Sequence, residues 1–204
     1  MPVSRRAFLL FPLPASIALR CVAAAEAGGP VAVIQRFYDA LLSVMKEAKR
    51  LGFDQRYQRL APAVAQTYNL ALMSRLTIGP EWNRLQPAQQ QAVTDAFSRY
   101  TISLYANRFD DFNGERFEVD PSTTTNTNGV LVQSTFIKAD REKIVFNYLM
   151  RQTGDLWQAI DVYLNGTISQ LATQRSEYGS VLQQGGADAL VKLLDERIAG
   201  LRKG

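Results

Sequence analysis

The residue most able to do chemistry in this sequence is Asp161, which stands between apolar neighbours in the stretch LWQAIDVYLNG. A carboxylate in an apolar setting could serve as a general base, because burial raises its pKa. Tyr148 or Tyr163 could then donate to a developing oxyanion, as in an isomerase with a cone-shaped α+β fold. The alternative is structural, with Asp161 accepting hydrogen bonds from nearby backbone or from Arg175. One carboxylate without an assembled partner set favours the structural role.

Composition excludes several other chemistries. The sequence has no histidine, and its only cysteine is Cys21, close to the N-terminus. Catalysis by Cys or His, Ser-His-Asp triads, the usual zinc sites and disulfides are therefore not expected in the remainder of the chain, and no metal or cofactor is predicted. Residues 1–25 hold three of the 23 basic side chains and none of the 19 acidic ones, so the rest is nearly neutral. That balance argues against nucleic-acid binding.

The N-terminus has the form of an export signal over residues 1–25. A basic start precedes an apolar run from Ala7 to Leu19 and an exit of three alanines. Arg5 and Arg6 also resemble a twin-arginine signal, although paired arginines occur in ordinary signals too. Arg20 precedes Cys21 and spoils a lipoprotein cleavage site. We expect localisation in a periplasm.

The spacing of apolar residues predicts three helices in the first half of the mature chain. Pro62 should interrupt or bend the second helix, and the dipeptide Gly79-Pro80 marks a loop before the third. The predicted helices run from Ile34 to near Gly52, from Asp54 to about Met73, and from Pro87 to about Asn107.

The periodicity then changes to that of strands. Phe117 and Val119 alternate with charges as on an edge strand, and Asn128-Gly129 favours a hairpin turn. Three more strands are predicted over residues 130–137, 143–151 and 156–164. Two helices should close the chain, one over about residues 168–183 and one after Gly185-Gly186. We therefore predict one α+β domain over residues 26–204, a four-stranded antiparallel meander with helices before and after it.

The predicted sheet has two partly apolar faces. Phe146, Tyr148 and Met150 share one face of the third strand, while the other face carries Val145 and Leu149. Both faces should therefore be partly covered. The large side chains could line an apolar pocket between sheet and helices, or they could simply be core.

Motifs in the C-terminal third and in the predicted central helix resemble those of a known family. Four motifs occur in order along the chain. They are a Trp-x-x-x-Asp strand (Trp157, Asp161), a Gly corner with Ser (Gly166, Ser169), an Arg-Ser-x-aromatic helix (Arg175, Tyr178) and a Gly-x-Asp-x-Leu segment (Gly186, Asp188, Leu190). Upstream, the central-helix pattern recurs at Trp82, Leu85, Pro87, Gln89, Gln90 and from Phe97 to Tyr105. Together these resemble the MlaC / toluene-tolerance family. The corner Gly166-Thr167-Ile168-Ser169 is one residue longer than usual. The form Gly-Thr-Ile-Ser-Gln-Leu-Ala, followed by Arg175-Ser176-Glu177-Tyr178, resembles the hopanoid-biosynthesis-associated branch called HpnM.

The resemblance implies a soluble, non-catalytic periplasmic lipid carrier. Such carriers move phospholipid, or here a hopanoid-type lipid, between inner and outer membranes. Their partners are an inner-membrane lipid transporter complex and an outer-membrane lipoprotein complex, and the acyl tails lie in a deep apolar pocket. Burying tails gains about 0.8 kcal/mol per CH₂ without polar contacts, so pocket residues are poorly marked in sequence. From facing positions, the candidates are Tyr105, Phe109, Val132, Phe136, Phe146, Tyr148, Met150, Val162 and Ile168.

Two other hypotheses remain. One is a pocket enzyme with Asp161 as base, which requires a buried carboxylate and hydrogen-bond donors facing the pocket. The other is a non-lipid-binding accessory of a membrane complex, with a filled core and an exposed apolar patch.

Overall fold

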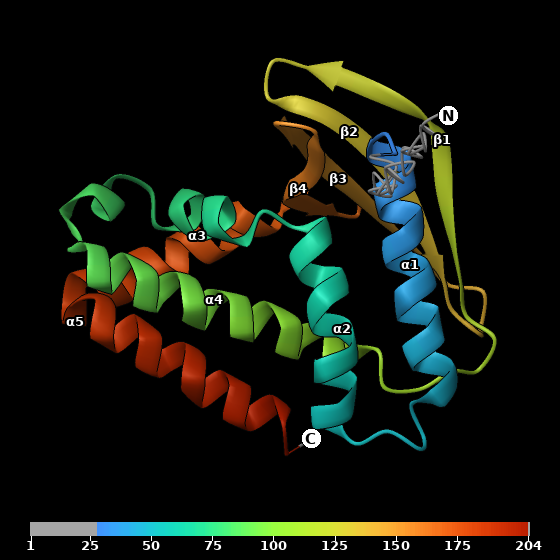
Figure 1. Ribbon diagram of the computed structural model, residues 1–204, viewed down its shortest axis with the longest axis horizontal. Helices are drawn as coiled ribbons and strands as arrows, with labels where there is room; N and C mark the ends of the chain where they lie inside the picture. Colours follow the sequence, from blue (N-terminus) through green and yellow to red (C-terminus); the bar gives the residue numbers. More distant parts are fainter. Residues whose placement is uncertain (1–27, 204) are drawn as a thin grey trace, which may run out of the picture.

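The computed structural model describes residues 28–203 and has an α+β architecture (Figure 1). Helices α1 to α4 precede a five-stranded antiparallel sheet, and the long helix α5 follows it. The predicted export signal, residues 1–25, lies outside the described residues. Among the described helices, none combines the length and the apolar character that a bilayer span requires.

Helix α1 (Pro30–Glu47) begins with a proline, which suits the first turn because that position needs no N–H donor. Its apolar face is buried along its whole length, with Ile34, Phe37 and Leu41 almost fully excluded from solvent. Figure 1 shows α1 running beside the sheet, where it contacts β1, β2 and β4.

The second predicted helix is divided differently from the prediction. Helix α2 (Phe53–Thr67) continues through Pro62, and the break falls at Tyr68, whose backbone is extended. Tyr68 forms a parallel bridge to Ala159 of β4, and the Asn69 amide donates to the Ala159 carbonyl at 3.0 Å. Asn69 then caps α3 (Leu70–Ile78). The prediction placed the irregularity at Pro62 because the bridge from Tyr68 to Ala159, far along the chain, leaves no trace in local periodicity.

A 3-10 helix, η1 (Gly79–Arg84), connects α3 to α4 (Pro87–Arg108). Gly79 has a φ of 67°, and a side chain there would overlap the guanidinium of Arg175 from α5. Glycine is therefore favoured by the positive φ, whereas the Arg175 side chain could move aside from a larger residue.

The sheet is a meander of β1 (Arg116–Asn126), β2 (Gly129–Ile137), β3 (Lys143–Thr153), β4 (Leu156–Leu164) and β5 (Ile168–Ser169). The four predicted strands are confirmed. The fifth has two residues and occupies the position where a helix was predicted to start, so α5 (Gln170–Leu201) begins two residues later. Within α5, Gly186 leaves the helical conformation with φ 70°, which is the predicted break between two helical segments.

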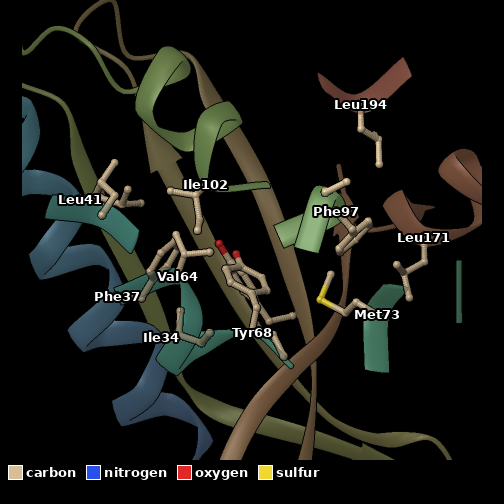
Figure 2. Packing of buried hydrophobic residues seen from close by; sticks show 14 of the residues in the cluster. Ile34, Phe37, Leu41, Val64, Tyr68, Met73, Phe97, Ile102, Leu171 and Leu194 are labelled. Carbon is tan, nitrogen blue, oxygen red and sulfur yellow. The ribbon is translucent and has the colours of Figure 1, made fainter. Parts of the chain in front are cut away.

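The strand register places one set of side chains on the face toward the helices. Val132, Tyr148 and Val162 stand side by side across β2, β3 and β4. Figure 2 shows how the core continues from there: Tyr68 lies among Ile34, Phe37 and Val64, with Met73 and Phe97 on its other side. The face of the sheet toward α1 and α4 therefore packs into the core and positions the candidate site.

Candidate functional site

A cavity of about 160 Å³ lies between the sheet and the helices. Its walls come from α1, α3, α4, β1, β3, β4 and the start of α5. Five of the nine predicted pocket residues line it: Tyr105, Phe109, Phe146, Tyr148 and Val162. The sequence analysis did not select its other lining residues, which are Tyr38, Leu41, Tyr68, Met73, Phe97, Thr101, Leu104, Arg108, Phe117, Leu164, Gln170 and Gln174.

Four predicted pocket residues do not line this cavity. Val132 and Met150 are fully buried in the core. Val132 pairs with Tyr148 of β3, and Met150 pairs with Ala159, where the break after α2 closes onto β4. Phe136 stands behind the cavity wall, with its ring 5.9 Å from the ring of Phe109. Ile168 is 51% exposed on the short strand β5.

Most of the missed residues belong to helices, because the sequence pattern fixes the facing side of a strand more closely than that of a helix. A facing position on a strand follows from alternation, whereas the part of a helix face that meets a cavity depends on how the helices pack. Met73 and Phe97 carry apolar spacing like any core residue. The one available signal was the density of tyrosine in the sequence, with Tyr38 and Tyr68 among the residues that were not selected.

Four tyrosines form a hydroxyl network at the cavity, which we call the tyrosine network: Tyr38, Tyr68, Tyr105 and Tyr148, together with Ser134. The Tyr38 hydroxyl lies 2.5 Å from Ser134 Oγ and donates to the Tyr148 hydroxyl at 2.9 Å. A second hydrogen bond joins the hydroxyls of Tyr68 and Tyr105. The network thereby links α1 to β2 and β3, and the end of α2 to α4.

Burial keeps these phenols neutral. Removal from water raises the pKa of Tyr105 to about 12, and raises the pKa values of Tyr38, Tyr68 and Tyr148 in the same direction. A neutral phenol in an apolar wall can donate or accept one hydrogen bond but offers no charge. The network is therefore suited to closing the wall and not to proton transfer near neutral pH.

Aromatic rings fill the space around the network. Tyr38 stacks on Phe117 at 4.1 Å between ring centroids, and Tyr105 stacks on Phe109 at 5.8 Å. Phe37 meets Tyr105 edge to face at 5.1 Å. These contacts join α1, α4 and β1, so the inner wall is a continuous set of rings with favourable packing.

Polar side chains meet the cavity where it approaches solvent. We call Thr101, Arg108, Gln170 and Gln174 the polar rim. Arg108 is exposed, while both glutamines and Thr101 are half-buried. An aromatic interior with a polar rim is the arrangement expected of a site for an amphipathic molecule.

Asp161 lies outside this site. One carboxylate oxygen accepts from the amides of Val162 at 2.7 Å and Leu171 at 3.2 Å, and the other accepts from the Ser169 hydroxyl at 2.5 Å. Asp161 is not among the cavity-lining residues, and Arg175 lies against Gly79 instead. Asp161 thus closes the corner between β4 and α5, as the structural alternative predicted.

A larger, open groove of about 1020 Å³ runs between α1, α2 and the β3–β4 turn. Arg36 and Arg59 line it, and Arg59 is paired with Glu47 at 2.9 Å. The small cavity is the better candidate for an apolar ligand, since rings enclose it on several sides. Within residues 28–203, no cluster of three or more acidic, Cys or His side chains could hold a metal ion.

Two comparisons with known proteins bear on the site. The model of the MlaC protein family matches residues 35–196. The fold is similar to that of the phospholipid-binding protein from Ralstonia solanacearum, solved in complex with a phospholipid, with a TM-score of 0.74 and 21% sequence identity. The similarity covers 85% of this chain and 99% of that one. It supports the α+β fold with helices before and after the sheet.

Proposed function

This chain belongs to the MlaC family, and on that premise we propose that it is a non-catalytic carrier that holds lipid tails in the cavity between sheet and helices. The observation that carries the proposal is the cavity itself, which is enclosed by rings and aliphatic side chains and has a polar rim. Tails that enter such a wall gain about 0.8 kcal/mol per CH₂ without any specific polar contact. The phospholipid complex of the Ralstonia solanacearum protein supports the same kind of ligand.

The size of the cavity adds a requirement. Pockets for drug-sized ligands begin at about 300 Å³, whereas this cavity measures about 160 Å³. Lipid tails can therefore enter only when wall elements or rings move apart. The hydroxyl bonds of the tyrosine network are the polar contacts that must open, at a net cost of about 1 kcal/mol each.

The location and the partners belong to the same proposal. The export-signal pattern of residues 1–25 supports a periplasmic carrier. The family resemblance supports docking to an inner-membrane lipid transporter complex and to an outer-membrane lipoprotein complex. The resemblance of residues 166–178 to the hopanoid-biosynthesis-associated branch supports a hopanoid-type cargo as the alternative to a phospholipid.

The test is native mass spectrometry of the mature protein purified from its periplasm, followed by organic extraction and identification of the bound molecules. We expect about one phospholipid or hopanoid-type lipid per chain. A protein that carries no lipid, and takes none from added vesicles, would contradict the carrier function and favour a non-lipid-binding accessory. The enzyme hypothesis has no support from the cavity, because Asp161 does not face it.

A further inference from the structure

Two Asn-Gly dipeptides stand in exposed turns of the sheet. Asn128-Gly129 closes the hairpin between β1 and β2, and Asn165-Gly166 lies at the corner between β4 and β5. Both asparagine side chains are exposed. Because glycine has no side chain to shield its backbone nitrogen, that nitrogen can reach the side-chain amide carbon of the preceding asparagine. The same reactive groups therefore occur in two structural settings.

At the hairpin, the glycine nitrogen is engaged. The Gly129 amide donates to Asn126 Oδ1 at 3.2 Å, and the Asn128 amide donates to the same oxygen at 2.8 Å. The Asn128 carbonyl accepts from the Arg151 guanidinium at 3.2 Å. An amide that donates a hydrogen bond is held in position and retains its proton more firmly. These contacts therefore protect Asn128 from attack by the nitrogen of Gly129.

At the corner, the glycine nitrogen is free. Within residues 28–203, the Gly166 amide has no hydrogen-bond acceptor, and the Asn165 side chain makes no hydrogen bond. The Asn165 amide donates to the Val145 carbonyl at 2.8 Å, and the Gly166 carbonyl lies 3.5 Å from Asn147 Nδ2. The two ends of the dipeptide are thus held, while the N–H between them is open to base.

We propose that Asn165 is a site of spontaneous deamidation in the folded protein, and that its hydrogen bonds protect the hairpin at Asn128. A base removes the proton of the Gly166 amide nitrogen, which attacks Asn165 Cγ. The new N–Cγ bond forms a succinimide ring, and the Cγ–Nδ2 bond breaks to release ammonia, which takes up a proton. Water then opens the ring at either carbonyl and leaves an aspartate or an isoaspartate at position 165. Water is the only co-reactant, and nothing is oxidised or reduced.

The product changes the corner that follows β4. Either form adds a negative charge, and the isoaspartate also adds a methylene group to the backbone. The short pairing of β4 with β5, which joins Leu164 to Ile168 and Tyr163 to Ser169, begins beside this position. Leu164 also lines the cavity, so the modification acts at the edge of its wall. The reaction requires no lipid and no partner, and its test is therefore independent of the proposed carrier function.

The experiment follows both sites in one sample. The mature protein is incubated in mildly alkaline buffer, either folded or unfolded in guanidinium chloride, then digested with trypsin and analysed by tandem mass spectrometry. The tryptic peptide 152–175 contains Asn165 as its only asparagine, and the tryptic peptide 117–138 contains Asn128. Fragment masses identify the modified position in each peptide.

A pair of variants tests the cause of the protection. Asn126→Ala removes the oxygen that accepts from the Gly129 amide, and should raise the rate at Asn128 in the folded protein by about fivefold, the factor that one hydrogen bond supplies. Thr127→Ala is the matched control, since Thr127 is exposed in the same turn and its side chain makes no hydrogen bond among residues 28–203. An equal rate at Asn128 in both variants would overturn the assigned cause.

We expect the folded wild type to deamidate at Asn165 at least about fivefold faster than at Asn128. In the unfolded protein the two rates should be similar, because both sites then present the same Asn-Gly peptide to solvent. An intact Asn165 in the folded protein, or equal rates at the two sites, would overturn the inference. A slower reaction at Asn128 in the unfolded protein would also overturn it, because the difference would then come from neighbouring residue types and not from the fold.

Discussion

Two buried polar clusters lie on opposite faces of the same sheet, and they are built in different ways. Asp161 finds its partners one, eight and ten residues away along the chain, at Val162, Ser169 and Leu171. The tyrosine network finds its partners 37, 96 and 110 residues away. Since neighbouring residues of a strand point to opposite faces, Asp161 turns away from the cavity that Val162 lines.

The difference separates a structural site from a candidate ligand site. Asp161 closes a corner with local partners and has both carboxylate oxygens in use. The tyrosine hydroxyls join separate elements across a cavity, so their bonds can open when those elements move. A buried polar group is thus more informative about ligand binding when its partners come from distant parts of the chain and face a common space.

The largest expected effect comes from a charge placed in the cavity. We expect Phe146→Asp to reduce lipid occupancy at least about tenfold, because an ionised carboxylate in an apolar wall costs several kcal/mol and opposes the burial of tails. Native mass spectrometry after vesicle loading measures it. Gln152→Asp, an exposed position on the same strand, is the control. Equal occupancy in both variants would mean that lipid does not occupy this cavity.

A substitution of Asp161 should lower the stability of the fold and leave lipid binding unchanged. We expect Asp161→Ala to lower the free energy of unfolding by about 3 kcal/mol, because the Leu171 amide and the Ser169 hydroxyl lose a charged acceptor. Urea denaturation measures this, with Asp155→Ala in the exposed β3–β4 turn as control. Lipid occupancy of the folded fraction should match the wild type. A well-folded Asp161→Ala that no longer holds lipid would remove the distinction between the clusters.

Alkaline pH should act on the tyrosine network. Burial raises the pKa of Tyr105 from 10.0 to about 12. The neutral phenol is therefore favoured in the folded protein, so its contribution is fully present below pH 10 and is lost as the pH rises toward 12. For Tyr105 alone the loss is about 2 kcal/mol by pH 12. Thermal unfolding monitored together with tyrosinate absorbance measures the effect.

The neighbouring phenols should make the loss of stability with rising pH steeper, because the pKa values of Tyr38, Tyr68 and Tyr148 are raised as well. In Tyr105→Phe, the loss of stability above pH 10 should be smaller than in the wild type. An identical pH profile in this variant would show that Tyr105 ionises as easily in the folded as in the unfolded protein, against its burial.

The smallest effect is expected from one hydroxyl group. Tyr38→Phe removes the bonds to Ser134 and Tyr148 and should cost about 1 kcal/mol of stability, while it loosens the link between α1 and the sheet. Lipid uptake from vesicles should become faster for the same reason. Tyr57→Phe is the control, since the half-buried Tyr57 makes no side-chain hydrogen bond among residues 28–203. Uptake slower than in the wild type would contradict a closing role for the network.

Much of the fold was predictable because its signals are local. The hairpin at Asn128-Gly129, the alternation along β2 to β4 and the break at Gly186 each follow from residues a few positions apart. The position of the break between α2 and α3 was wrong, because Tyr68 leaves the helix to pair with Ala159. Facing positions on strands and helices identified five of the residues that line the cavity. Val132, Met150 and Ile168 show that such facing is not sufficient, because Val132 and Met150 are buried in the core and Ile168 is exposed at the sheet edge.

The sequence by itself determined the composition that removes Cys and His chemistry from residues 28–203, the order of the elements, the family resemblance and the corner that Asp161 closes. All of these depend on residue type or on spacing within about ten positions. Only the tertiary structure decided that Tyr38, Tyr68, Tyr105 and Tyr148 meet at one cavity. The physical reason is that these contacts join elements far apart in the chain, and packing between those elements, not local propensity, sets which faces meet.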